Sequence, residues 1–88
     1  MKPKQDDTHP YFLWDYNLTE DDVRRILHGE NEAERIWMKS RILTHAAYED
    51  VWKYLTLNDI VSEFSKLRMR SQTAQAWRHA LTVWGHHV

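Results

Sequence analysis

Apolar residues recur at helical spacing along most of this chain, and the repeat is clearest over residues 57–84. The first stripe is typical of an amphipathic helix and consists of Leu57, Ile60, Val61, Phe64 and Leu67. The second stripe consists of Ala74, Trp77, Leu81 and Trp84. Ser71 is suited to cap this second helix, and Gly85 can end it in a left-handed conformation. We expect two helices joined by a short basic turn, as a helix-turn-helix or as the centre of a small bundle.

Three further helices are predicted before this pair. Thr19 and Asn31 are suited to cap the first two, and Gly29 separates them. In the second helix an inward-facing stripe is formed by Ala33, Ile36, Trp37 and Ser40. The face expected in solvent includes Glu32, Glu34, Arg35, Lys39 and Arg41. The third helix follows Tyr48, Val51, Trp52 and Leu55, with Glu49 and Lys53 spaced to pair. The fourth starts at Thr56 or Asn58.

These patterns predict an all-α protein, because no segment alternates at the period of a strand for long enough to form one. We expect one small bundle of about five short helices, with an extended aromatic N-terminal arm. Residues 1–9 are expected to form a flexible polar tail, and residues 10–88 a single helical domain.

The aromatic arm contains Tyr11, Phe12 and Trp14. Large aromatic side chains are mostly buried, so these rings can close one side of the core. Clustered aromatic residues are also typical hot spots of protein interfaces, so they are candidate anchors for a partner. The two interpretations can apply to different rings.

The residues that most enzymes rely on are scarce or scattered. Cysteine is absent, which excludes disulfides and thiolate zinc sites and suits a reducing compartment. The only glycines are Gly29 and Gly85, so no glycine-rich phosphate loop is present. The histidines are dispersed or lie at the frayed C-terminus. We expect no catalytic residues, no metal site, no cofactor, no membrane span and a cytoplasmic, bacterial-type location.

Charge is distributed unevenly although the net charge is only −1. Residues 1–34 carry four basic and nine acidic side chains (−5), whereas residues 35–55 and 56–88 each carry four basic and two acidic ones (+2). DNA is a possible partner, because the last helix would present Gln72, Gln75 and Arg78 to bases, with Arg68 and Arg70 at phosphates. The weak basic surplus and the tryptophans of that helix argue against this hypothesis.

A protein partner is the other hypothesis for the same helix. Its polar stripe comprises Gln75, Arg78, His79, Thr82 and His86, and Arg68 and Arg70 extend it. Arginine beside aromatic residues is typical of protein interfaces. The candidate interface residues, for protein or nucleic acid, are Arg68, Arg70, Gln72, Gln75, Arg78, His79 and Thr82.

The run HPYFLWDYN, the acidic helix after it and the run VWKYLTLNDIVSEFSKLRMRSQTAQAWRHAL resemble a small bacterial helical domain family. The matching positions are Phe12, Trp14, Asp15, Tyr54, Leu55, Ile60, Leu67, Arg68, Ser71, Thr73, Ala74 and Trp77. Members are similar to proteins encoded beside nucleotidyltransferase-type toxins of the abortive-infection class. The resemblance implies an antitoxin-like or accessory role.

We therefore expect a non-catalytic protein-interaction module that binds and neutralises a partner toxin. Charge complementarity suggests that Arg68, Arg70 and Arg78 face the acidic metal-binding site of a nucleotidyltransferase. The alternative is a helix-turn-helix transcriptional regulator whose second helix runs from Ser71 to Trp84. A homo-oligomer formed through the aromatic arm is a third possibility.

Overall fold

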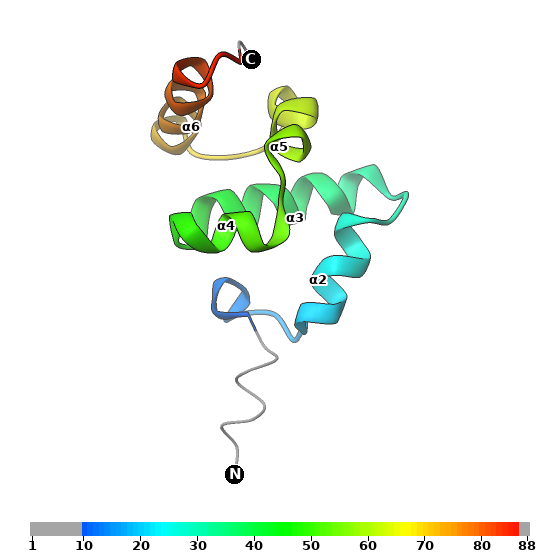
Figure 1. Cartoon of the computed structure of the whole chain (residues 1–88). Helices are drawn as coiled ribbons and strands as arrows, with labels where there is room; N and C mark the ends of the chain where they lie inside the picture. Colours follow the sequence, from blue (N-terminus) through cyan, green and yellow to red (C-terminus); the bar gives the residue numbers. More distant parts are fainter. Residues whose placement is uncertain (1–9, 87–88) are drawn as a thin grey trace.

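The computed structural model describes residues 10–86, so the predicted tail at residues 1–9 lies outside the described residues. Within this range the chain forms five α-helices and two short 3-10 helices, and no strand (Figure 1). In chain order these are η1 (Tyr11–Leu13), α2 (Glu20–Leu27), α3 (Glu32–His45), α4 (Tyr48–Tyr54), α5 (Leu57–Glu63), η2 (Phe64–Lys66) and α6 (Ser71–Val83). The predicted all-α bundle of five short helices is confirmed.

Most helix ends follow local sequence signals. Thr19 and Thr56 each form a capping box, in which the threonine hydroxyl accepts a hydrogen bond from the backbone N–H three residues later. Asn31 caps α3 in the same manner, accepting from the backbone N–H of Glu34 at 3.1 Å. Gly85 has a φ of 92°, the left-handed conformation expected of it.

The predicted cap at Ser71 is wrong. Ser71 is already the first helical residue of α6, and Arg70 occupies the N-cap position without a side-chain hydrogen bond. Arg70 has φ −59° and ψ 150°, because it ends an extended segment that leads into the helix. The Ser71 hydroxyl therefore does not cap this helix.

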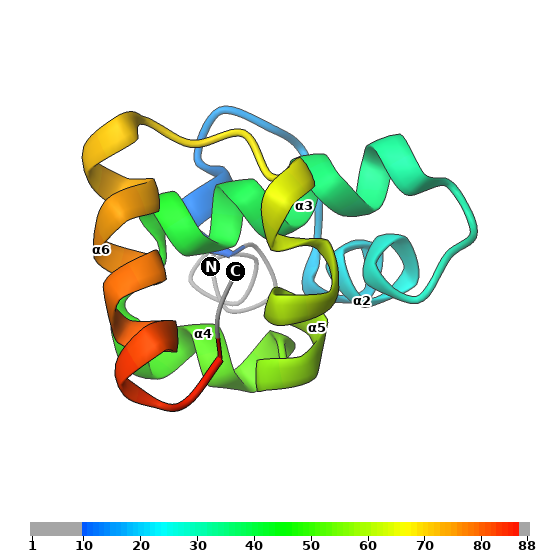
Figure 2. The same cartoon turned by 90° about the horizontal axis from the view of Figure 1, so that it is seen from above.

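Helix α3 runs through the middle of the molecule (Figure 1). η1 and α2 lie on one side of it, while α5 and α6 lie on the other, side by side when seen from above (Figure 2). Every helical element of residues 10–86 contributes to one core, which contains Phe12, Leu13, Val23, Met38, Ile42, Leu43, Val51, Leu55, Ile60, Phe64 and Leu81. α3 supplies three of these side chains, so the other elements pack around it.

The aromatic arm is folded into the 3-10 turn η1 and is not extended over these residues. Phe12 and Leu13 are buried by this turn. The Tyr11 hydroxyl donates to Asp50 Oδ2 at 2.6 Å and accepts from the backbone N–H of Ala47 at 2.6 Å. These bonds fasten the arm to the start of α4.

Two expectations for α3 are corrected. Ala33 is exposed, because it lies in the first turn of the helix. Lys39 is buried, because its ammonium donates to Glu63 Oε1 and to the backbone carbonyl of Asp59, each at 2.7 Å. Arg35 pairs with the second oxygen of Glu63 at 3.1 Å. Glu63 of α5 therefore joins this helix to α3.

The ion pair expected between Glu49 and Lys53 is not formed. Lys53 forms its ion pair with Asp50, three residues before it, and not with Glu49. Asp50 already accepts the Tyr11 hydroxyl, so its carboxylate holds both groups. This carboxylate is therefore part of the contact between arm and α4.

Candidate functional site

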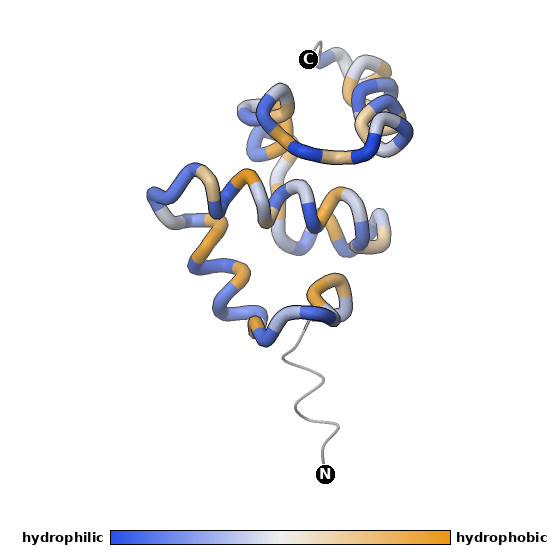
Figure 3. Tube along the Cα trace, turned by 180° about the vertical axis from the view of Figure 1, so that it is seen from behind, coloured by the Kyte–Doolittle hydropathy of each residue, from blue (hydrophilic) through white to orange (hydrophobic). Residues whose placement is uncertain are grey.

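The segment between η2 and α6 alternates basic and apolar residues in the order Lys66, Leu67, Arg68, Met69 and Arg70. The basic side chains are exposed, whereas Leu67 and Met69 pack against the core. Figure 3 shows this change of hydropathy along the connection. Successive residues of an extended chain point to opposite faces, which explains the pattern. The backbone N–H of Arg68 donates to the buried Ser40 Oγ at 2.9 Å and so holds the segment beside α3.

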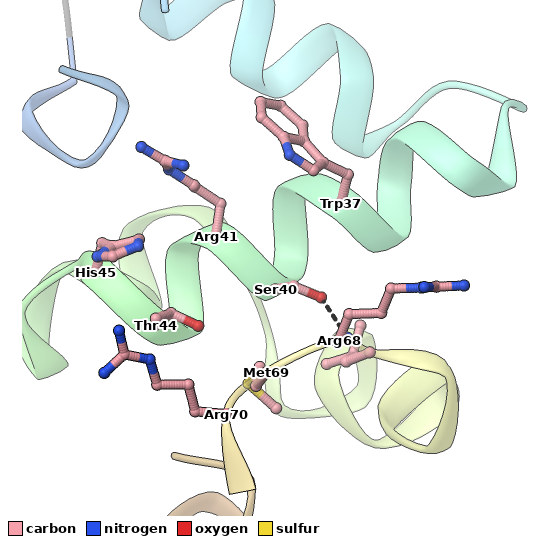
Figure 4. Close-up of a pocket in the computed structure, with 9 residues that line it drawn as sticks. Trp37, Ser40, Arg41, Thr44, His45, Arg68, Met69 and Arg70 are labelled. Atoms are coloured by element: carbon pink, nitrogen blue, oxygen red, sulfur yellow. Dashed lines mark hydrogen bonds between the residues drawn. The ribbon is translucent and has the colours of Figure 1, made fainter. Parts of the chain in front are cut away.

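A groove of about 690 Å³ lies between this segment and α3 (Figure 4). It is lined by Trp37, Ser40, Arg41, Thr44, His45, Leu67, Arg68, Met69 and Arg70, none of which carries a carboxylate. A second hollow of about 590 Å³ adjoins it and shares Trp37, Ser40 and Arg68. We call the two together the α3 groove.

The cations of the chain differ in whether they have a carboxylate partner. Within residues 10–86, every lysine and arginine forms an ion pair with a carboxylate except Arg68, Arg70 and Arg78. The sequence explains this, because residues 64–88 contain four basic residues and no Asp or Glu. Arg68 and Arg70 therefore give the α3 groove a positive charge that this part of the protein leaves unneutralised.

The aromatic arm adjoins the groove through α3. The Trp14 ring lies 4.5 Å from the Arg41 guanidinium and 5.0 Å from the His45 ring. Arg41 also donates to the backbone carbonyl of Phe12 at 2.9 Å and pairs with Asp15. Trp14 is 63% exposed, so a large apolar ring stands in solvent beside the basic groove.

The three candidate anchors of the arm have different environments. Phe12 is only 1% exposed and packs edge-on against Tyr54, so its assignment as an anchor is wrong. The Tyr11 ring is exposed, but both hydrogen bonds of its hydroxyl are made within the chain. Trp14 alone combines high exposure with a position next to the groove.

The candidates on α6 lie apart from the arm. Gln72, Gln75, His79 and Thr82 are exposed along the helix. The Arg78 guanidinium lies 5.5 Å from the centre of the Phe64 ring, so it is directed toward η2. The Thr82 hydroxyl donates to the backbone carbonyl of Arg78 at 2.9 Å. The structure thus places Arg68 and Arg70 in the groove and Trp14 against Arg41 and His45 of α3, whereas the candidates on α6 do not line the groove.

Several groove residues were not identified from the sequence, namely Trp37, Arg41, Thr44, His45 and Met69. The first four recur at helical spacing on α3, but that spacing predicts only a shared face. The basic–apolar alternation over residues 66–70 was a detectable signal of an extended segment with two distinct faces.

Among the described residues with a perturbed pKa, Lys66 lines the groove, and its hydrogen bond to Glu32 raises its pKa; the other perturbed groups lie outside the groove. A hydrogen bond from Lys39 lowers the pKa of Glu63, and Arg35 acts in the same direction. Burial raises the pKa of Tyr54 to about 12, and its hydrogen bond to Glu20 adds to this. Both perturbations have structural causes, so neither marks a group prepared for acid–base chemistry.

Within the described part of the chain, no group of three or more histidine or carboxylate side chains is arranged to hold a metal ion. No helix of residues 10–86 has the length and apolar character needed to cross a bilayer. Comparison with protein-family models, curated proteins and solved structures finds no match.

Proposed function

We propose that this chain is a non-catalytic protein-interaction module that binds and neutralises a partner toxin in the cytoplasm. The α3 groove and the adjoining Trp14 are the proposed contact surface. The observation that carries the proposal is the pair of exposed arginines, Arg68 and Arg70, which have no carboxylate partner within residues 10–86 and lie near an exposed tryptophan. Arginine and tryptophan are the residues most enriched at interface hot spots.

The proposed partner presents an acidic surface to the groove. Because Arg68 and Arg70 form no ion pair within residues 10–86, a carboxylate from a partner would not have to displace an internal one. The resemblance noted in the sequence suggests a nucleotidyltransferase-type toxin. Such an enzyme would be inhibited by occlusion of its acidic metal-binding site.

The second candidate is a DNA-binding regulator that uses α6. Two observations favour it: Gln72 and Gln75 are exposed in the first turns of α6, and the Glu63 charge is compensated by Lys39 and Arg35. The connection between α5 and α6 argues against it. This connection covers residues 64–70 and includes the η2 turn, whereas a helix-turn-helix has a turn of only three to four residues.

Affinity capture from the host with the tagged chain tests the proposal, with and without nuclease. A matched pair of double variants is included: Arg68→Glu with Arg70→Glu in the groove, and Arg24→Glu with Arg25→Glu on α2. We expect a protein partner that survives nuclease treatment, is lost with the groove variant and is retained by the α2 variant. Co-expression of the chain should also relieve growth arrest caused by that partner.

The DNA-binding regulator would be favoured if only DNA is recovered. That recovery would have to be lost on nuclease treatment and in the double variant Gln72→Ala with Gln75→Ala. Capture of a partner equally well by the groove variant and the wild type would reject the groove as the contact surface.

A further inference from the structure

We infer that the α3 groove recognises an extended acidic segment of its partner, in which apolar side chains separate the acids. This inference rests on the proposed function and names the chemistry of the bound segment. It depends on the shape of the groove, on the position of its cations and on the carboxylates around it.

The shape of the groove suits a short extended peptide. Its α3 side is one helical stripe that runs from Ala33 through Trp37 and Ser40 to His45. At about 1.5 Å per residue, this stripe is about 18 Å long. An extended chain rises about 3.3 Å per residue, so about five or six residues span the groove.

The two sides of the groove offer different contacts along this length. Leu67, Met69 and Trp37 supply apolar surface at its base. Arg68 and Arg70 extend in opposite directions from the segment, and Arg70 is directed toward Thr44 and His45 (Figure 4). Two anionic side chains separated along an extended peptide can each meet one guanidinium, while an apolar side chain between them contacts Met69.

The borders of the groove favour a peptide over a nucleic acid strand. At one end Glu32 pairs with Lys66 at 2.5 Å, and Glu34 lies exposed nearby on α3. On the arm side, Asp15 is paired with Arg41 and is exposed. A polyphosphate chain carries a charge at every residue and would bring a phosphate against Glu32, which lines the groove, whereas a peptide with separated acids can place an apolar residue there.

The direct test uses a capped peptide of about seven residues in which glutamate and leucine alternate. Its binding to the full chain is measured by isothermal titration calorimetry, beside an otherwise identical glutamine–leucine peptide and an oligothymidylate of equal charge. We expect the glutamate peptide to bind more tightly than both other probes. Arg68→Gln with Arg70→Gln should weaken its binding about tenfold or more, because charge-assisted hydrogen bonds are lost. Arg24→Gln with Arg25→Gln removes the same charge from α2 and should leave the affinity within about twofold.

Three outcomes would overturn the inference: equal binding of the glutamine peptide, tighter binding of the oligonucleotide, or equal loss in the two double variants. A failure of the model peptide to bind can be distinguished from a failure of the proposed function. If the host partner is still captured through the groove, the module binds a protein but recognises something other than an extended acidic segment. If neither peptide nor partner depends on the groove, both proposals are wrong.

Discussion

The two sides of α3 differ in whether the basic side chains there are buried and paired with a carboxylate. Toward α5, the buried Lys39 and the partly buried Arg35 share the carboxylate of Glu63. Toward residues 66–70, Arg68 and Arg70 are exposed and have no carboxylate partner within the described chain. A charge removed from water must be paired to be tolerated, whereas an exposed charge costs the fold little. The first side therefore maintains the fold, and the second is available for binding.

The largest expected effect comes from removing the shared carboxylate. Glu63→Ala leaves the buried Lys39 ammonium without its anionic partner, so we expect a loss of about 3 kcal/mol in the free energy of unfolding. Urea denaturation measures this, with Glu49→Ala on the exposed face of α4 as the control. A loss below about 1 kcal/mol would show that Glu63 does not maintain the fold, and would remove the contrast between the two sides.

The pH dependence of stability sharpens the same point. The pKa of Glu63 is lowered below its ordinary value of 4.5, chiefly by the hydrogen bond from Lys39. The resulting stabilisation is fully present above pH 4.5 and is lost as the pH falls through the lowered folded-state pKa. Glu63→Gln should be less stable at neutral pH and should lose less stability on acidification. The stability of this variant still depends on pH, because the pKa values of Asp22 and Asp50 are also lowered.

Denaturant midpoints at several pH values below and above 4.5 provide the measurement. Identical slopes for the wild type and Glu63→Gln would place the acid sensitivity in other carboxylates.

A smaller effect is expected where the groove is attached to α3. Ser40→Ala removes the acceptor of the Arg68 backbone N–H, so we expect a loss of about 1 kcal/mol. The same change should weaken binding of the acidic peptide, because the segment is no longer held beside α3. Ser65→Ala, on the exposed surface of η2, is the control for both measurements. Unchanged stability and unchanged peptide binding would show that this hydrogen bond does not position the groove.

The smallest effect on stability is expected for the groove cations themselves. Arg68→Gln with Arg70→Gln breaks no ion pair within residues 10–86, so the free energy of unfolding should change by less than about 0.5 kcal/mol. Urea denaturation of this double variant is compared with that of Glu63→Ala. A loss of more than about 1 kcal/mol would mean that these arginines serve the fold, which contradicts the comparison.

The helices could be predicted because their signals are local. The caps at Thr19, Asn31 and Thr56 depend on residues within one turn, and the apolar spacing identifies the buried face of each helix. The burial of Lys39 could not be predicted in this way, because its partner Glu63 is 24 residues away in the sequence.

The candidate site was predictable only in part. Arg68 and Arg70 were identified because they form the basic turn directly before the last predicted helix. The contributions of Arg41 and His45 depend on how η1 places Trp14 against α3, and helical spacing carries no information on that contact. The same turn buries Phe12 and exposes Trp14. Composition alone cannot show which of the two aromatic side chains is buried.

The most direct test of the account is an amide chemical-shift map of the ¹⁵N-labelled chain bound to its captured partner. The account predicts that the largest changes fall at Arg68, Met69 and Arg70, at His45, and at the indole N–H of Trp14. Changes confined to the polar stripe of α6, from Gln72 to Thr82, would contradict it and place recognition on that helix.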